Sequence, residues 1–203
     1  MGEHTQTGLV AAASIHAYDT NRIRRHEFTR PDKEDDRVRQ IEALNAQTGP
    51  VLLACKSDKE VNAILAQVTA GEPDFDLVAD DGIGHSLWVV QDPHLLDDIT
   101  RRFEAMPSLY IADGHHRSAA ASRVAAQRGI AGDAGVFLTV RFPHDQMLIL
   151  DYNRVVRDLS GQSPEVFLAR VSEHFRVSPS ATPVSPAGPG SFGMYLAGQW
   201  YVL

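Results

Sequence analysis

Apolar positions along the chain recur at spacings that predict helices separated by strands. Val61, Ile64 and Leu65 lie three or four residues apart, which places them on one face of a helix. Pro31 suits the first turn of a helix, and Ser57 is the expected N-cap of the next one. The predicted helices span about 32–46, 57–68, 93–105, 115–128 and 164–174.

Short apolar runs between the helices predict strands. These runs span 8–15, 51–55, 75–79, 85–90, 109–112, 135–142, 147–150, 191–196 and 199–203. Alanine leaves a helix open as the alternative for the first run. Asp81-Gly82 is a hairpin turn signal, and the proline-rich stretch 178–190 predicts a loop or linker. We expect an α/β (α+β) fold, in which a mixed sheet is flanked by helices.

A chain of 203 residues suits one large or two small domains. We expect a functional core in residues 1–150 and a smaller helix-plus-hairpin extension in residues 151–203. The chain starts and stops almost on predicted strands, which indicates a fragment of a longer protein. The first strand near Gly8 and the last near Trp200 should then lie at sheet edges.

Composition narrows the class of protein. Hydrophobic residues make up 43% and charged residues 22%, which is ordinary for a soluble globular protein. The net charge of -7 argues against nucleic acid as the partner. The single cysteine, Cys55, excludes an intrachain disulfide and fits a reducing cytosol. The sequence has no apolar run of about 18 residues and no signal peptide, so we expect a cytoplasmic protein without membrane insertion.

The segment from Asp113 to Arg117 carries the densest chemistry. It follows a short apolar run and precedes an alanine-rich one, which predicts a strand, a tight turn and a helix. A helix N-terminus has free N–H groups and suits an anion. Gly114 lets the backbone approach a ligand closely, and His115, His116 and Arg117 add donors. Three roles are open for Asp113: helix cap, metal ligand or base.

A second polar cluster runs from Arg22 to Arg37. A solvated helix face and its lead-in is the simpler interpretation of such a charge run. In the functional interpretation, Arg30 and Arg37 clamp phosphates, and Glu27 takes a proton from an attacking hydroxyl. Phosphoryl transfer needs mainly positioning and charge neutralisation, which such a cluster supplies.

Several familiar sites are absent from the sequence. His26-Glu27 begins like a zinc-protease motif, but Arg30 stands where the second histidine is required and Pro31 breaks the helix. His115 and His116 are adjacent, so on a helix they point about 100° apart and do not naturally chelate one ion. We therefore rank zinc below Mg²⁺ bound together with a nucleotide. No Walker A loop, nucleophile elbow or Rossmann fingerprint is present.

At the Asp113–Arg117 block the chain resembles the DUF1015 family of proteins. The resemblance covers about residues 2–157. Its motifs are His4-Thr5-Gln6-Thr7-Gly8-Leu9-Val10, Ile23-Arg24-Arg25-His26-Glu27-Phe28-Thr29-Arg30, His85-Ser86-Leu87-Trp88 and Ile111-Ala112-Asp113-Gly114-His115-His116-Arg117. Members of this family are longer than this chain, so the resemblance also implies a fragment.

The same block is more distantly similar to the phosphate-binding motif of the ParB and sulfiredoxin superfamily. That superfamily includes nucleotide-dependent free serine kinases and CTP-binding partition proteins. The resemblance implies a ParB/sulfiredoxin-like core in which Gly114, His115, His116 and Arg117 hold nucleotide phosphates. A glutamate upstream is the base in the kinases, and extending that role to Glu27 is an extrapolation.

Three hypotheses follow from the sequence. The leading one is a nucleotide-phosphate-binding protein that acts as a kinase on a small-molecule hydroxyl. In it Asp113 orients Mg²⁺ or the acceptor, and ATP, ADP and CTP remain open as the nucleotide. The second is a nucleotide-responsive regulatory module that does no chemistry. The third is a structural fragment whose site another segment completes, and a homo-oligomer is compatible with all three.

Overall fold

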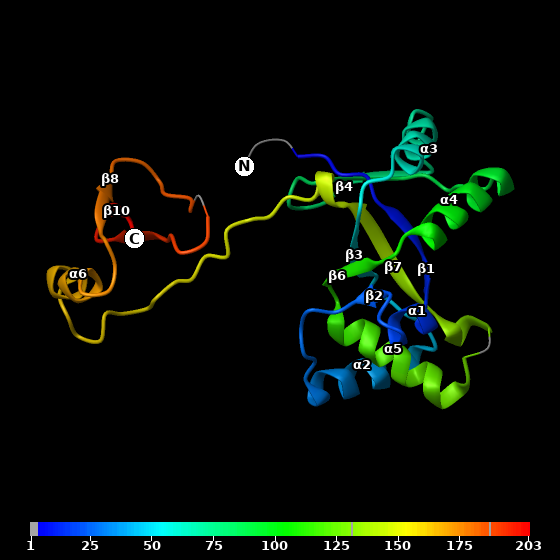
Figure 1. The fold of residues 1–203 in the computed structure, drawn as a ribbon, viewed down its shortest axis with the longest axis horizontal. Coiled ribbons are helices and arrows are strands. Elements are labelled where there is room, and N and C mark those ends of the chain that lie inside the picture. The colour runs from blue at the N-terminus through cyan, green and yellow to red at the C-terminus, as the bar shows by residue number, and fades with distance from the viewer. Residues whose placement is uncertain (1–3, 131, 187) are drawn as a thin grey trace. The chain divides into compact units, whose positions relative to one another are not determined.

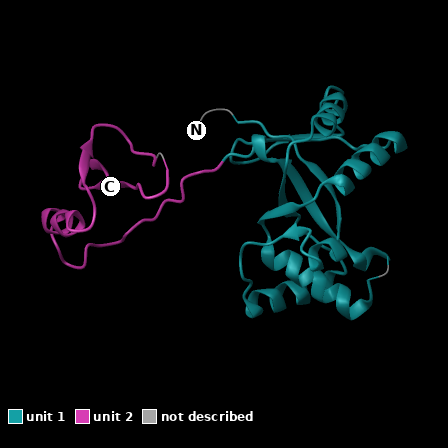
Figure 2. Cartoon of the chain, viewed as in Figure 1, with its two compact units in different colours: residues 1–148 teal, residues 149–203 magenta. Residues whose placement is uncertain are grey.

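The computed structural model describes residues 4–130, 132–186 and 188–203. The chain divides into two compact units, residues 1–148 and residues 149–203 (Figure 2). The first unit contains the polar clusters that the sequence singles out, and it is the unit that positions the candidate site.

The longer helices of the first unit form close to their predicted positions, and a short helix that was not predicted forms before them (Figure 1). They are α1 (Ile15–Asp19), α2 (Pro31–Leu44), α3 (Lys59–Thr69), α4 (Pro93–Ala105) and α5 (His115–Arg128), with short 3₁₀ turns at Gly132–Gly135 and His144–Gln146. Local capping explains the starts of α3 and α4. The side chains of Asp58 and Asp92 accept hydrogen bonds from the first free N–H groups of these helices. The prediction of Ser57 as the cap of α3 is wrong by one residue.

Five strands of this unit form one mixed sheet, which confirms the predicted fold class. They are β1 (Leu9–Ser14), β2 (Ile23–Arg24), β3 (Val51–Cys55), β6 (Leu109–Asp113) and β7 (Val136–Pro143), in the order β1-β7-β3-β6-β2. The pairs β3–β7 and β2–β6 are parallel, and the pairs β1–β7 and β3–β6 are antiparallel. A separate hairpin joins β4 (Phe75–Val78) to β5 (Gly84–Leu87), as the sequence predicts.

One face of the sheet carries the core. Alternate residues of β3 point inward, so Val51, Leu53 and Cys55 are buried while the residues between them are half-buried. Side chains from α1, α3, α4 and α5 pack against this face. On the opposite face, Val10 and Tyr110 remain 54% and 48% exposed. The helices therefore cover the sheet mainly on one side.

The second unit is a small α+β unit. It contains α6 (Pro164–Ser172) and a three-stranded sheet of β8 (Ser178–Ser180), β9 (Gly193–Leu196) and β10 (Gln199–Val202), in the order β8-β10-β9. The predicted loop at 178–190 thus contributes a short strand. Aromatic pairs support the unit: Phe175 meets Phe192 edge-on at 5.9 Å, and Tyr195 lies 5.1 Å from Trp200.

Two expectations about strands are corrected. Met147–Leu150 forms no strand, and Ile149 within it is 94% exposed. The reason is that β7, the preceding strand, is already paired on both sides by β1 and β3, so a returning strand has no free edge beside it. β1 lies at a sheet edge as expected, but Trp200 lies in β10, which is the central strand of its sheet.

Candidate functional site

Three segments of the first unit meet at one edge of the sheet. Because β2 and β6 are parallel, both end at this edge, and because β3 is antiparallel to β6, β3 begins there with Leu52 opposite Asp113. The segments are residues 25–30 after β2, residues 48–50 before β3, and residues 113–117 after β6. The topology therefore brings both polar clusters of the sequence to one place.

The turn from β6 into α5 has the predicted strand, turn and helix arrangement. Gly114 is the N-cap residue of α5 and has φ of 97°, a left-handed conformation that suits glycine. Within the described residues, no side chain caps this helix. The first main-chain bond of the helix runs from the N–H of Ser118 to the carbonyl of Gly114. The cap role considered for Asp113 is thus wrong, while its metal and base roles stay predictions.

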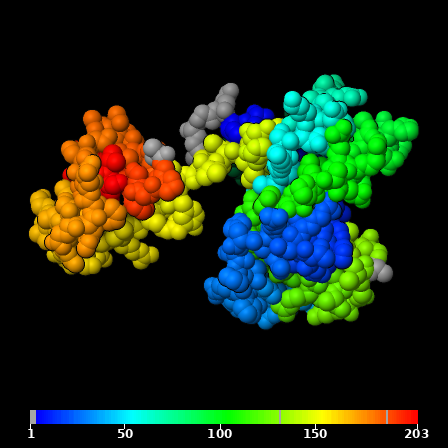
Figure 3. Space-filling model, in the orientation of Figure 1, coloured from blue at the N-terminus to red at the C-terminus, as the bar shows by residue number. Residues whose placement is uncertain are grey.

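A second helix N-terminus lies beside the first. The main-chain N–H of Arg30, at the start of α2, donates to His116 Nε2 near the start of α5 at 3.1 Å. At the other ends of the two helices, Arg128 donates to the side chain of Asn45 at 2.7 Å. The helices are therefore packed in parallel, and they lie together at one end of the unit (Figure 3). Both positive dipole ends point to the same edge.

His115 is almost fully buried beneath this edge, with 3% of its surface exposed. Its Nδ1 lies 3.3 Å from Glu27 Oε2, and its ring meets the ring of His26 edge-on at 4.5 Å. Burial, with a smaller contribution from His26, lowers the pKa of His115, although Glu27 and Asp113 oppose the shift. His115 is therefore neutral at neutral pH. Its Nε2 is buried and, among the described residues, has no hydrogen-bond partner.

Arg117 is the cation that the turn itself supplies. Its Nη2 lies 2.6 Å from Asp113 Oδ2, one helical turn earlier. Its Nε is buried, and the described part of the chain offers it no acceptor. A Cβ built on Gly114 would lie 2.9 Å from this Nε, and one built on Gly49 would lie 3.5 Å from Nη1. The guanidinium is thus held between two glycines from different segments.

The upstream arginines reach the turn unequally. The main chain of Arg30 is hydrogen-bonded to α5, but its guanidinium pairs with Asp32 at 2.8 Å. Arg37 donates to Gln40 at 2.8 Å within α2. The structure thus brings Glu27 and Arg30 to the turn, while the hydrogen-bond partner of Arg37 lies on its own helix.

The loop that carries Gly49 was missed by sequence reasoning. Read locally, Gly49-Pro50 indicates only that the preceding helix stops, because glycine and proline commonly mark a turn. Nothing local in the sequence connects this loop to Arg117, which lies far along the chain. The contact exists because β3 starts beside the end of β6.

No ready-made metal cluster is present in the described ranges, since no three His, Cys, Asp or Glu side chains come together as a possible metal site. Asp113, with 71% of its side chain exposed, is a single accessible carboxylate. A single carboxylate fits Mg²⁺ that arrives with phosphates, because Mg²⁺ is commonly held by one or two carboxylates plus substrate phosphates.

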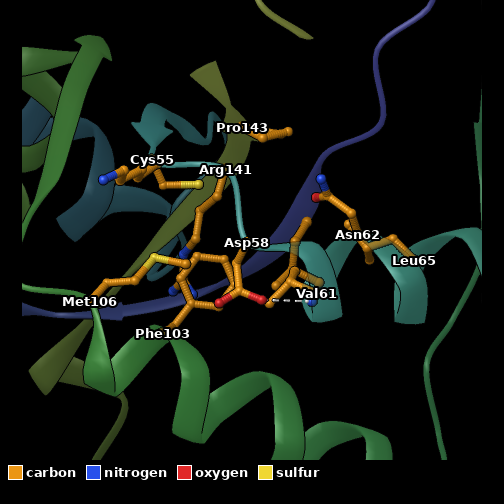
Figure 4. A pocket seen from close by; sticks show the side chains of 11 residues that line it. Cys55, Asp58, Val61, Asn62, Leu65, Phe103, Met106, Arg141 and Pro143 are labelled. Carbon is orange, nitrogen blue, oxygen red and sulfur yellow. Dashed lines mark hydrogen bonds between the residues drawn. The ribbon is translucent and has the colours of Figure 1, made fainter. Parts of the chain in front are cut away.

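A pocket lies at the opposite edge of the sheet, where β3 ends (Figure 4). Arg141 stacks over the ring of Phe103 at 4.8 Å and donates to the Thr139 hydroxyl and the carbonyl of Ala12. Burial lowers the pKa of Arg141 and raises the pKa of the Cys55 thiol, which also lines the pocket. The guanidinium is thus anchored by the protein's own groups, and burial disfavours the reactive thiolate of Cys55. We interpret this pocket as structural.

A comparison with known proteins identifies the family of this chain. A family model described as "Protein of unknown function (DUF1015)" matches residues 1–203. The chain belongs to the DUF1015 family. No curated protein and no solved structure matches it. In the part of this DUF1015 chain that the structure describes, no helix has the length and apolar character needed to cross a membrane.

Proposed function

We propose that this protein binds nucleotide phosphates at the N-terminus of α5 and acts as a kinase that transfers a phosphoryl group to a small-molecule hydroxyl. The observation that carries the proposal is the buried Nε–H of Arg117, a donor with no acceptor among the described residues, beside a helix start that no described side chain caps. Buried polar atoms are nearly always hydrogen-bonded, so such an atom favours a ligand or a water at this place.

The surroundings favour an anionic ligand. The N-termini of α2 and α5 both present partial positive charge, and Gly114 leaves the backbone open to close approach. Arg117 adds a guanidinium that matches the geometry of phosphate oxygens. Its present partner, the carboxylate of Asp113, is itself an anion, which indicates how a phosphate would sit. His115 is neutral, so it contributes to anion binding through its main-chain N–H rather than as a cation.

Each predicted residue then has a role in the reaction. Main-chain N–H groups of Gly114, His115 and His116, with the side chain of Arg117, hold the phosphates. The guanidinium of Arg30, at the start of α2, would leave its ion pair with Asp32 and bind the phosphates instead. Arg37 lies farther along that helix and serves as the outer clamp.

Glu27 is the proposed base, and His115 orients it. A proton on His115 Nδ1 would face the Glu27 carboxylate across the observed 3.3 Å. That contact fixes the carboxylate near the turn while 58% of the Glu27 side chain remains exposed to an incoming hydroxyl. Asp113 would hold Mg²⁺, which supplies charge neutralisation on the phosphates when it is bound.

The distant resemblance to the ParB and sulfiredoxin superfamily supports the same proposal. The strand, glycine turn and helix fit the phosphate-binding motif of that superfamily, whose members include free serine kinases. We therefore propose a ParB/sulfiredoxin-like core, with ATP, ADP or CTP as the nucleotide. L-serine is the first acceptor to test.

One observation favours a second function, a regulatory module that binds a nucleotide and leaves it intact. Both acidic side chains of the site already have partners, Asp113 on Arg117 and Glu27 on His115. A carboxylate that accepts a hydrogen bond or pairs with a cation is a poorer base than a free one, because either interaction favours its charged form. Binding without chemistry would need neither acid.

Binding is tested by calorimetry with ATP, ADP and CTP, each with and without Mg²⁺. We expect Arg117→Gln to weaken binding by tenfold or more, since charge-assisted bonds to a half-buried guanidinium are strong. Arg128→Gln, at the far end of the same helix, removes the same charge and should bind like the wild type. No binding by the wild type, or equal loss in both variants, contradicts the proposed site.

Chemistry is tested by following transfer of labelled phosphate from the nucleotide to L-serine and to a panel of small alcohols. Glu27→Gln should bind the nucleotide normally and lose turnover, because the amide cannot accept the proton. Glu42→Gln, an exposed change on α2, is the matched control. A wild-type protein that binds the nucleotide and never consumes it favours the regulatory module.

A further inference from the structure

Phe28 has an unusual setting at this site. Its side chain is 100% exposed, so it touches nothing in the described structure. The residues around it are all held in place. Glu27 contacts His115 Nδ1, the Thr29 hydroxyl donates to Glu34, and the main-chain N–H of Arg30 donates to His116.

The anchoring places Phe28 at the mouth of the proposed phosphate site. Consecutive Cα atoms are about 3.8 Å apart, so Phe28 lies one residue from Glu27 and two residues from Arg30. Those two neighbours contact the first and second residues of α5, whose N–H groups face the proposed phosphates. The segment therefore crosses the start of α5 and presents an aromatic ring beside it.

Phe75, another exposed aromatic residue of the first unit, lacks this combination. Phe75 is 66% exposed, but it lies in the β4–β5 hairpin and pairs with Leu87 across the strands. A ring that is fixed at its backbone and free on both faces is suited to stacking, because a planar ligand can cover it without moving the protein.

We propose that Phe28 stacks on the base of a nucleotide whose phosphates lie at the N-terminus of α5. This inference rests on the proposed nucleotide site and adds the residue that holds the base, which would distinguish a nucleoside di- or triphosphate from pyrophosphate or a sugar phosphate. Every base has a π face, so stacking tolerates different bases. A purine offers the larger face, and ATP should therefore bind at least as tightly as CTP.

The test compares ATP, CTP and inorganic tripolyphosphate, each with Mg²⁺, by calorimetry on the full chain. The affinity for tripolyphosphate reports on the phosphate site alone, and the difference in affinity between ATP and tripolyphosphate reports on the contribution of the nucleoside. Phe28→Ala should weaken ATP binding by about fivefold to a hundredfold, the range found when stacking residues are truncated, and leave tripolyphosphate binding unchanged. Phe28→Trp should retain ATP binding, and Phe75→Ala is the matched control.

The experiment distinguishes failure of the phosphate site from failure of the stacking by Phe28. If tripolyphosphate binds and ATP binds no more tightly, stacking is wrong and the phosphate site stands. If neither binds, both are wrong. If Phe28→Ala leaves ATP affinity unchanged but alters the oligomeric state in size-exclusion chromatography with light scattering, Phe28 is a contact for another chain and the inference is overturned.

Discussion

Replacing Gly114 by alanine tests how tightly the turn is built. Gly114 has φ of 97° and ψ of 26°, where an L-residue is disfavoured by about 1–2 kcal/mol. Alanine also restricts the unfolded chain, which raises the free energy of unfolding by about 0.4–1 kcal/mol and offsets part of this loss. The backbone alone therefore accounts for a loss of about 1 kcal/mol in the free energy of unfolding.

Arg117 adds a second contribution. The new Cβ would lie 2.9 Å from both Nε and Nη2 of Arg117, so the guanidinium must move. Gly49 lies against the other side of the guanidinium, and its Nε is buried, so the movement disturbs packed atoms. We expect this disturbance to lower the free energy of unfolding by about 1 kcal/mol. The ion pair with Asp113 is largely exposed and adds at most about 0.5 kcal/mol.

We therefore expect Gly114→Ala to lower the stability of the first unit by about 2 kcal/mol, or Tm by about 4–8 °C. Two glycines serve as controls. Gly82 has φ of 79°, and no described heavy atom lies within 4 Å of a Cβ built there, so Gly82→Ala should cost about 1 kcal/mol. A Cβ on Gly49 would make ordinary contacts at 3.5 Å, so Gly49→Ala should change stability by less than about 0.5 kcal/mol.

The assay is urea unfolding followed by far-UV circular dichroism, with nucleotide affinity measured on the same variants. Gly114→Ala should also lose affinity, because the displaced guanidinium and the new methyl group disturb the proposed phosphate position. A stability loss no larger than that of Gly82→Ala would show that Arg117 is free to move, and the close packing inferred around it would be wrong.

Three further predictions concern other side chains of the first unit. Burial lowers the pKa of His115 from 6.5, so the stability that comes from keeping this imidazole neutral is fully present above about pH 6.5 and is lost as pH falls towards the folded pKa. The free energy of unfolding, measured with urea between about pH 5 and pH 8, should therefore depend less on pH for His115→Gln than for the wild type. Burial raises the pKa of Cys55, so iodoacetamide should label this thiol slowly in the folded chain and rapidly in guanidinium, as followed by mass spectrometry. Arg22 donates to the carbonyls of Phe103, Glu104 and Met106 at the end of α4, and Arg22→Ala should therefore lower the free energy of unfolding by about 1–3 kcal/mol in the same urea assay.

Helices were the most predictable part of the fold, because their signals are local. Pro93 and an N-cap aspartate mark the start of α4, and Gly114 and Gly129 bracket α5, so both helices have the predicted bounds. Strand pairing is not local in this way. The apolar residues 147–150 have the composition of a strand, but the sheet has no edge for them beside β7.

The burial of His115 could have been read from the sequence. Ser118 and Ala119 follow it at spacings of three and four residues, and all three are buried on the inner face of α5. His116 and Arg117 lie outside this stripe and are only half-buried. Treating the two histidines as equivalent donors overlooked this periodicity. The partnership of His115 with Glu27 was out of reach, because it depends on the parallel pairing of β2 and β6.

The charges at the turn are balanced within the protein, and this constrains any ligand. A bare phosphate that takes the place of Asp113 on Arg117 leaves that carboxylate beside an added negative charge, which opposes binding. A phosphate that carries its own divalent cation offers an anion to Arg117 and a cation to Asp113 together, so both halves of the ion pair find new partners. The arrangement therefore favours nucleotide with Mg²⁺ over nucleotide alone, and equal affinity with and without Mg²⁺ would remove the proposed role of Asp113 while leaving the main-chain N–H groups as the anion site.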